Sequence, residues 1–306
     1  MKPTVSPQTR QTVLDLRRCH SLRQVAERTG LPLGTVKTIC SRSGAFRDNQ
    51  TLRELCTLPP IQQSESTTLT VPELPPQEVV TGDKEVDAVL WLRQVISTGQ
   101  AALIEKAMLA AKRIKTPLAE LEKRYRDHLV AQNPGHFASA WGSFGFADLK
   151  ELADTSTEKL TRQHDALSRF GSVDALFDKT AAEQFCIDAL AGLKRKREFD
   201  EFDATQVDQR FHARPDLMPQ TLSDCLHELA YWDNLYTIRK ASHDDAGDHW
   251  QEVYGRTDFV FRSLTRIRAR TKEEAVAVFR YLADSEYMDR EEINDILINL
   301  IGSPSQ

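Results

Sequence analysis

The cationic side chains of this sequence are concentrated near its N-terminus. Residues 1–60 contain ten Lys or Arg against four Asp or Glu, whereas residues 61–306 contain thirty against forty-one. Ammonium and guanidinium groups neutralise phosphates, and this neutralisation supplies most of the non-specific affinity of proteins for nucleic acid. The sequence therefore predicts that a polyanion binds the basic N-terminal part rather than the acidic remainder. The alternative interpretation is a chance excess of basic residues in a short segment.

Histidine and cysteine side chains do not form a convincing metal or catalytic site. The densest group of possible ligands is the run His243-Asp244-Asp245-Ala246-Gly247-Asp248-His249, which a solvated loop with Asp248 as a helix cap explains equally well. The cysteines form no CxxC pair, and the spacing of the first three, even with His20, matches no zinc finger. They are Cys19, Cys40, Cys56, Cys186 and Cys225. We expect Cys19, Cys40 and Cys56 to be buried as small apolar side chains, and all five cysteines to be reduced in the cytoplasm.

The common phosphate-binding, nucleophile and zinc-protease motifs are missing from the sequence. It contains no GxGxxG, GxxxxGK[ST], GxSxG or HExxH. We therefore expect a protein that is not an enzyme and needs no cofactor or metal. An enzyme whose catalytic residues are dispersed along the chain stays an alternative, because such residues leave no spacing to detect.

The elements that would position the N-terminal cations are two helices joined by a tight turn. Residues 21–44 read SLRQVAERTGLPLGTVKTICSRSG, in which Ala26 is small enough for a helix crossing and Gly30 tolerates a left-handed backbone. Pro32 presets the backbone before the second helix. Shared apolar contacts are expected from Leu22, Val25, Leu31, Val36 and Ile39. A further helix upstream would bury Val13, Leu14 and Leu16.

This segment resembles the helix-turn-helix of bacterial and phage repressors, site-specific recombinases and terminase small subunits. The resemblance covers about 35 of the 306 residues, and Thr29 departs from it where an aliphatic residue is commoner. It implies that the second helix enters the major groove of duplex DNA. The outward positions of that helix are Leu33, Gly34, Thr35, Lys37, Thr38, Ser41 and Arg42.

The same resemblance gives the outward side chains their expected roles. Lys37 and Arg42 would donate to guanine edges, while Thr38 and Ser41 would read either base partner or bond a phosphate. The side chains placed for phosphates, which fix register without reading sequence, are Arg17, Arg18, Arg23 and Arg47. A helix-turn-helix that contacts only protein is the alternative.

A proline-rich segment follows this basic region. Residues 59–83 contain Pro59, Pro60, Pro72, Pro75 and Pro76, no Lys or Arg before residue 83, and no helical period. Proline fixes φ and removes donors, so we expect an extended and flexible linker. The predicted organisation is a helix-turn-helix domain over 1–58, a linker over 59–83, and a helical region over 84–306 with a possible subdivision near 205–220.

The region after the linker is predicted to be all-α, because apolar residues recur with a helical period and strand-like alternation is missing. Stripes run from Val86 to Ile96 and from Leu103 to Ile114, and Thr116-Pro117 reads as a cap and first turn. Further helices are expected at about 146–169, 172–199, 221–241, 249–269, 271–284 and 289–301. Their expected caps are Ser172, Thr221, Thr271 with Glu274, and Asp289.

Two basic runs in this region read as solvated helix faces rather than a second nucleic-acid surface. Residues 194–197 (KRKR) precede acidic residues at i+4 spacing, including Glu198 and Glu201. The second run is a stripe of Arg262, Arg266 and Arg270, opposite Phe261, Leu264 and Ile267.

The leading functional hypothesis is a cytoplasmic, sequence-specific double-stranded DNA-binding protein that regulates transcription in a bacterium, phage or mobile element. A weak similarity of residues 225–286 to helical modules of phage proteins, through Trp232, Asp244-Asp245, Trp250 and Ile267–Thr271, favours that setting. We expect a homo-oligomer, as a dimer, with a possible protein partner on the helical region and no membrane span. A DNA-packaging or recombination accessory and a protein-binding adaptor are the alternatives.

Overall fold

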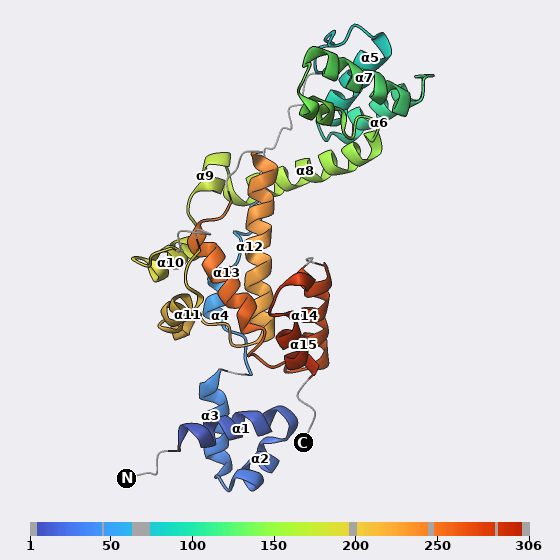
Figure 1. The fold of residues 1–306 in the computed structure, drawn as a ribbon. Helices are drawn as coiled ribbons and strands as arrows, with labels where there is room; N and C mark the ends of the chain where they lie inside the picture. The colour runs from blue at the N-terminus through green and yellow to red at the C-terminus, as the bar shows by residue number, and fades with distance from the viewer. Residues whose placement is uncertain are drawn as a thin grey trace. The chain divides into compact units, whose positions relative to one another are not determined.

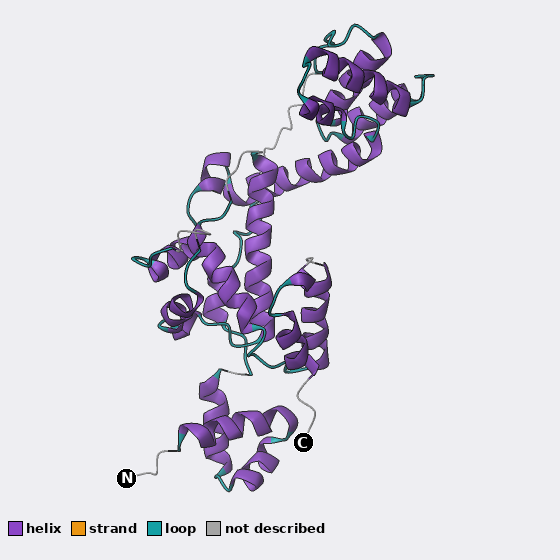
Figure 2. Cartoon of the chain, in the orientation of Figure 1, coloured by secondary structure: helices purple, strands orange, loops and turns teal. Residues whose placement is uncertain are grey.

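The computed structural model describes residues 5–44, 46–62, 74–195, 201–243, 248–284 and 287–301, and these are helices joined by turns and loops (Figure 2). The all-α prediction is therefore confirmed over the described residues. The chain divides into two compact units (Figure 1). Unit 1 comprises residues 1–58, 178–236 and 247–306, and unit 2 comprises residues 59–177 and 237–246.

The first three helices, in residues 5–44, form what we call the head. They are α1 (Pro7–Cys19), α2 (Leu22–Thr29) and α3 (Leu33–Ser43). Each contributes one fully buried valine, namely Val13, Val25 and Val36, so the three helices share one small core.

Local signals in the sequence fix the turns of the head. Ser21 and Gln24 form a reciprocal capping box at the start of α2, and Gly30 ends that helix with φ of 67°. A left-handed residue is costly for any side chain but glycine, which is why the turn falls there. Thr29 fits a partly buried position because its hydroxyl donates to the Val25 carbonyl at 2.7 Å.

The remainder of unit 1 surrounds a second and larger apolar core. Its helices are α4 (Gln50–Leu55), α10 (Ala181–Leu190), α11 (Ala204–His212), η2 (Pro215–Leu217), α13 (Gln251–Ser263), α14 (Lys272–Asp284), η3 (Tyr287–Asp289), α15 (Ile293–Ile301) and the first part of α12 (Leu222–Ser242). Phe211, Phe259 and Leu264 are fully buried at its centre, and α14 and α15 contribute Leu282 and Ile296.

Unit 2 is a separate helical cluster with its own core. It contains α5 (Lys84–Ile96), α6 (Ala101–Ala111), α7 (Leu118–Gln132), η1 (Phe137–Ser143), α8 (Leu149–Phe170) and α9 (Val173–Phe177). Val89, Ile96, Leu121 and Phe146 are buried together, and the Tyr125 ring lies 5.2 Å from that of Phe146.

Both described ends of the predicted linker pack against unit 2. At one end, the Pro59 carbonyl accepts from Arg169 Nη1 at 2.8 Å and Gln62 N–H donates to Ser168 O at 2.8 Å. At the other end, Trp91 Nε1 donates to the Pro75 carbonyl at 2.7 Å. Residues 63–73 of this segment lie outside the described residues. The segment leads from α4 into α5, and so from unit 1 into unit 2.

Several predicted helix limits need correction. The single helix over 172–199 is wrong, because α9 ends at Phe177 and Thr180 begins a new helix by a capping box with Glu183. The helix over 249–269 ends at Ser263, and the carbonyls of Leu264 and Ile267 accept from Asn299 Nδ2 instead of from helical amides. Helix α11 lies in a range where no helix was predicted.

The predicted caps are correct at three positions and wrong at two. The hydroxyls of Ser172, Thr221 and Thr271 each accept from the backbone N–H three residues on. Thr116 instead donates to Glu85 at 2.7 Å and leaves α7 without a side-chain cap. Asp289 ends η3, and α15 begins four residues later. None of the helices in the described ranges is both long and apolar enough to cross a bilayer.

An ion pair is buried in the core of unit 1. Arg256 on α13 and Glu228 on α12 are 0% and 1% exposed, and both carboxylate oxygens accept from the guanidinium, at 2.7 and 2.8 Å. The guanidinium also donates to the Leu217 carbonyl and lies 4.8 to 5.4 Å from the ring centres of three phenylalanines, Phe185, Phe211 and Phe259. A charge so far from water needs its partner, because desolvation is not otherwise compensated.

We predict that Glu228→Gln destabilises unit 1 by about 3–5 kcal/mol, since it leaves Arg256 buried without a counter-charge. Urea unfolding followed by circular dichroism measures the loss, and hydrogen exchange of α12 and α13 peptides locates it in unit 1. Replacing both partners in Glu228→Leu/Arg256→Met is expected to recover most of the loss. A double variant as unstable as the sum of the two single variants would contradict this account.

Candidate nucleic-acid interface

The outer face of α3 carries most of the predicted groove residues. Five of the seven side chains or positions are exposed: Gly34, Lys37, Thr38, Ser41 and Arg42. They recur at three- and four-residue intervals, opposite the fully buried Val36, so the helix presents them on one side. The other two, Leu33 and Thr35, are partly buried at the first turn.

The N-terminal end of α3 has an open backbone and carries the positive end of the helix dipole. Pro32 precedes the helix, no side chain caps it, and its first turn contains no acidic residue. The helix dipole and unpaired amides at such an end favour an anion. A Cβ built on Gly34 meets no atom within 4 Å, so the backbone there is open to close approach. The Thr38 hydroxyl donates within the helix, to the Gly34 carbonyl at 2.8 Å, and retains its capacity to accept.

The arginines predicted to contact phosphates are in different situations. Arg23 and Arg47 are exposed, whereas Arg17 is partly buried and donates to the His20 carbonyl at 3.0 Å. The Arg17 guanidinium also lies 6.0 Å from the Phe46 ring centre, so it is partly committed to the fold. The side chain of Arg18 lies outside the described residues. Arg28 was not among the predicted residues; it is exposed, and its Nη1 lies 2.6 Å from His20 Nε2.

The cations of the head are not neutralised by its own carboxylates. Residues 5–44 contain seven Arg or Lys but only two acidic residues, Asp15 and Glu27. Asp15 accepts from Gln11 at 3.1 Å, and no ion pair occurs among the described side chains of the head. The head therefore presents uncompensated positive charge to solvent, which is what a polyanion requires.

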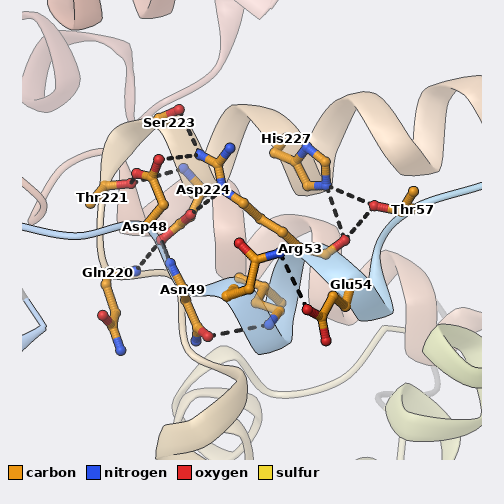
Figure 3. Close-up of polar contacts among 12 residues, drawn as sticks. Asp48, Asn49, Arg53, Glu54, Thr57, Gln220, Thr221, Ser223, Asp224 and His227 are labelled. Carbon is orange, nitrogen blue, oxygen red and sulfur yellow. Dashed lines mark hydrogen bonds and ion pairs between the residues drawn. The ribbon is translucent and has the colours of Figure 1, made fainter.

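Immediately after the head, a polar network anchors residues 48–57 to the remainder of unit 1 (Figure 3). Asn49 caps α4 through Leu52 N–H, and its side-chain amide donates to the carbonyls of Asp216 and Met218 at 2.8 and 2.9 Å. Its backbone N–H donates to the Asp224 carboxylate at 3.0 Å. This one side chain thus begins a helix and joins it to a segment about 170 positions away in sequence.

Asp224 on α12 is the centre of the network. The side chain is fully buried, and its carboxylate accepts from the backbone N–H groups of Asn49 and Gln220 and from Arg53 Nε, the last at 2.8 Å. Arg53 also donates to Ser223 at 2.7 Å and pairs with Asp48 at 3.2 Å. Every oxygen of the buried carboxylate therefore has a donor, as burial of a charge demands.

A second arginine extends the network to the α13–α14 connection. Arg270 pairs with Asp48 at 2.8 Å and with Glu274 at 3.0 Å, and Thr221 donates to Asp48 at 2.9 Å. On the other side of α4, His227 lies within 3.3 Å of the Arg53 carbonyl. Residues 48–57, which the sequence analysis placed in the DNA-binding region 1–58, thus contact the larger core of unit 1.

The three arginines of the predicted stripe in 262–270 are engaged in ion pairs. Arg262 and Arg266 both pair with Asp208, at 2.8 and 3.3 Å, and Arg270 is held as above. The predicted shared helical face is wrong, because α13 ends at Ser263, before Arg266 and Arg270. Of the three side chains, Arg266 is exposed to solvent, and Arg262 and Arg270 are partly buried. In the run 194–197, residues 196 and 197 lie outside the described part of the chain, as do the acidic residues 198 and 200 predicted to pair there.

The histidine-rich run is divided among different environments. His249 donates from Nε2 to the Trp232 carbonyl at 3.1 Å and its ring packs on Trp232, while the His243 ring makes an edge contact with Phe177. Residues 244–247 lie outside the described residues, and the described ones hold no cluster of three or more His, Cys, Asp or Glu suited to a metal.

Of the three cysteines predicted to be buried, the prediction is confirmed for Cys56. Cys56, Cys186 and Cys225 are buried, and burial raises the pKa of each thiol above its ordinary range, so they stay protonated and unreactive. Cys40 is partly buried, and the Cys19 side chain is outside the described residues.

No protein-family model matches this chain, and no curated protein or solved structure is significantly similar to it.

We predict that Asp224→Ala releases α4 from unit 1. The change leaves Arg53 and two backbone N–H groups without their acceptor, which costs about 3 kcal/mol. Hydrogen exchange on the full chain should show faster exchange in peptides covering residues 48–57 and unchanged exchange in α1 and α2. Glu54→Ala is the control, because Glu54 is exposed and bonds only Gln50 on its own helix. Equal exchange in the two variants would show that Asp224 does not hold α4.

Proposed function

We propose that this chain binds double-stranded DNA through its head, which acts as a helix-turn-helix with α3 as the recognition helix. The observation that carries the proposal is the face of α3 on which Lys37, Thr38, Ser41 and Arg42 are exposed together. An α-helix fits the major groove, and these side-chain types donate to or accept from base edges there.

The turn before α3 supports the same proposal. Gly30 takes the left-handed conformation, and Val25 and Val36 are buried on the inner sides of α2 and α3. A recognition helix must be held by such packing so that its outer face stays free. The open backbone at Gly34 and the uncapped N-terminal end of α3 would let a phosphate approach closely.

The positions of the cationic side chains separate those that would read bases from those that would contact phosphates. Lys37 and Arg42 lie on the exposed face of α3, whereas Arg23 is exposed on α2 and would contact the backbone of the duplex. Arg17 is a weaker candidate for phosphate than the sequence indicated, because the His20 carbonyl already accepts from it. Arg47 is exposed and stays in the phosphate-facing set, and Arg28 is an exposed addition to it.

We further propose that the protein is a transcriptional regulator. A head with base-reading side chains, joined to a much larger helical remainder, suits a protein that recognises a site and presents a second surface there. Genomic mapping of bound sites tests this proposal. Sites at promoters support regulation, a single site at a phage or plasmid end indicates packaging or recombination, and no sites would indicate a protein-binding adaptor.

We predict that Lys37→Ala/Arg42→Ala removes specific binding. A DNA site is first selected from random duplexes with the full chain, and its affinity is then measured by fluorescence anisotropy. Each groove contact is worth about 1–3 kcal/mol, so the double variant should lose roughly 30-fold or more in affinity. Lys112→Ala/Arg113→Ala removes the same charge from exposed positions of unit 2 and serves as the control. Equal affinities of the two double variants would refute the groove assignment.

We predict a different effect for Arg23→Ala. A phosphate contact carries no sequence information, so binding should weaken on selected and unrelated duplexes by similar factors. The slope of log K against log salt concentration should fall in magnitude by about 0.9. An unchanged slope, measured between about 50 and 200 mM salt, would place Arg23 outside the interface.

A further inference from the structure

The outer face of α14 carries apolar side chains that the rest of the described chain leaves exposed. Helix α14 turns Val278 and Leu282 into the core of unit 1, whereas Val276 and Phe279 are 46% and 52% exposed on the other side. Lys272 and Ala283 are exposed as well. At 3.6 residues per turn, positions 272, 276, 279 and 283 lie within about 60° of one another, so they form one stripe. We call this the α14 stripe.

We propose that the α14 stripe is the contact surface for a second copy of this chain, with the two α14 helices antiparallel about a two-fold axis. An isologous contact of this kind presses the same patch of each copy against the other. With the axis passing midway between residues 276 and 279, Val276 of one copy contacts the partner's Phe279, and the two phenylalanines close both ends of the apolar contact.

The charges at the ends of the stripe select the antiparallel arrangement. Lys272 is at the N-terminal end of α14 and Asp284 is at its C-terminal end, both exposed. About the same axis, residue 272 of one copy lies opposite residue 283 of the other and one residue, about 1.5 Å along the helix, from Asp284. Glu273 is likewise within reach of the partner's Arg280. A parallel pairing would instead oppose like charges at both ends.

We place exposed apolar side chains of the neighbouring elements in the same contact, because one stripe is narrow. A stable interface buries about 800 Å² on each partner. Met288 on η3 is 46% exposed, and η3 contacts both α14 and α15. On α15, Ile298 and Ile301 are 59% and 85% exposed. These three side chains extend the apolar surface from α14 to α15.

Dimerisation through this surface does not depend on DNA, but it bears on the proposed function. Two linked heads bind one duplex with an effective concentration that a single head lacks. The dimer is therefore tested without DNA, so that failure of this inference and failure of the proposed DNA binding can be told apart.

The first test is the oligomeric state of the full chain by light scattering and sedimentation between about 1 and 100 μM, a range that spans typical dissociation constants. The wild-type chain is expected to be a dimer, and Phe279→Glu is expected to raise its dissociation constant at least about 30-fold, because two charges enter the apolar contact. Leu109→Glu is the matched control, since Leu109 is 53% exposed on α6 in unit 2. A monomeric wild-type chain, or equal dissociation constants for the two variants, would overturn the proposal.

The second test is a charge swap, which keeps the helix face apolar and leaves folding intact. Lys272→Glu and Asp284→Lys are each expected to raise the dissociation constant about 3- to 10-fold, because each places two like-charged pairs in the dimer. The double variant Lys272→Glu/Asp284→Lys restores opposite charges at both ends and should return to the wild-type value. A double variant weaker than either single variant would reject the antiparallel pairing.

Discussion

Two buried carboxylates on one helix organise unit 1. Asp224 and Glu228 are four residues apart on α12, and each is almost completely buried. Carboxylates one helical turn apart repel each other, and neither could be ionised in the interior without a cation and further donors. Arg53 from α4 and Arg256 from α13 supply the cations. These two arginines are about 200 positions apart in the sequence. Pairing both carboxylates of α12 therefore brings residues 48–57 and 251–263 to the same helix.

The surroundings stabilise the two buried ion pairs in different ways. Around Asp224 the donors are backbone N–H groups of Asn49 and Gln220, so the carboxylate also ends a turn and begins a helix. Around Arg256 the surroundings are aromatic, and the guanidinium faces the rings of Phe211 and Phe259. Both arrangements tolerate little rearrangement, since a shift of either helix would strand a charge away from water. We take them as the reason why α4, which is only six residues long, has a defined position.

Sequence patterns predict the parts of this fold whose cause is local, and they fail where the cause is distant. The turn at Gly30, the buried Val25 and Val36, and the caps at Thr221 and Thr271 follow from residues within a few positions of one another. Asn49 and Arg53 bind partners about 170 positions away, and no periodicity reveals such a pairing. The shared helical face of Arg262, Arg266 and Arg270 was predicted wrongly for the same reason. Helix α13 ends at Ser263, and the distant Asn299 binds the carbonyls of Leu264 and Ile267. The prediction of one helix over 172–199 was wrong for a local reason. Thr180 and Glu183 form a capping box that begins a new helix, and the apolar pattern obscured it.

The distribution of paired and unpaired cations explains why the head is the candidate site. In unit 1 beyond the head, Arg53, Arg256 and Arg262 each face a carboxylate within 3 Å, so little of their field reaches solvent. In the head, Lys37 and Arg42 have no such partner among the described residues. An unpaired surface cation acts over a Debye length of about 8–10 Å, whereas a paired one is cancelled close to its origin. Net charge is thus a poor guide to where a polyanion would bind such an acidic chain, and the local pairing of each arginine is a better one.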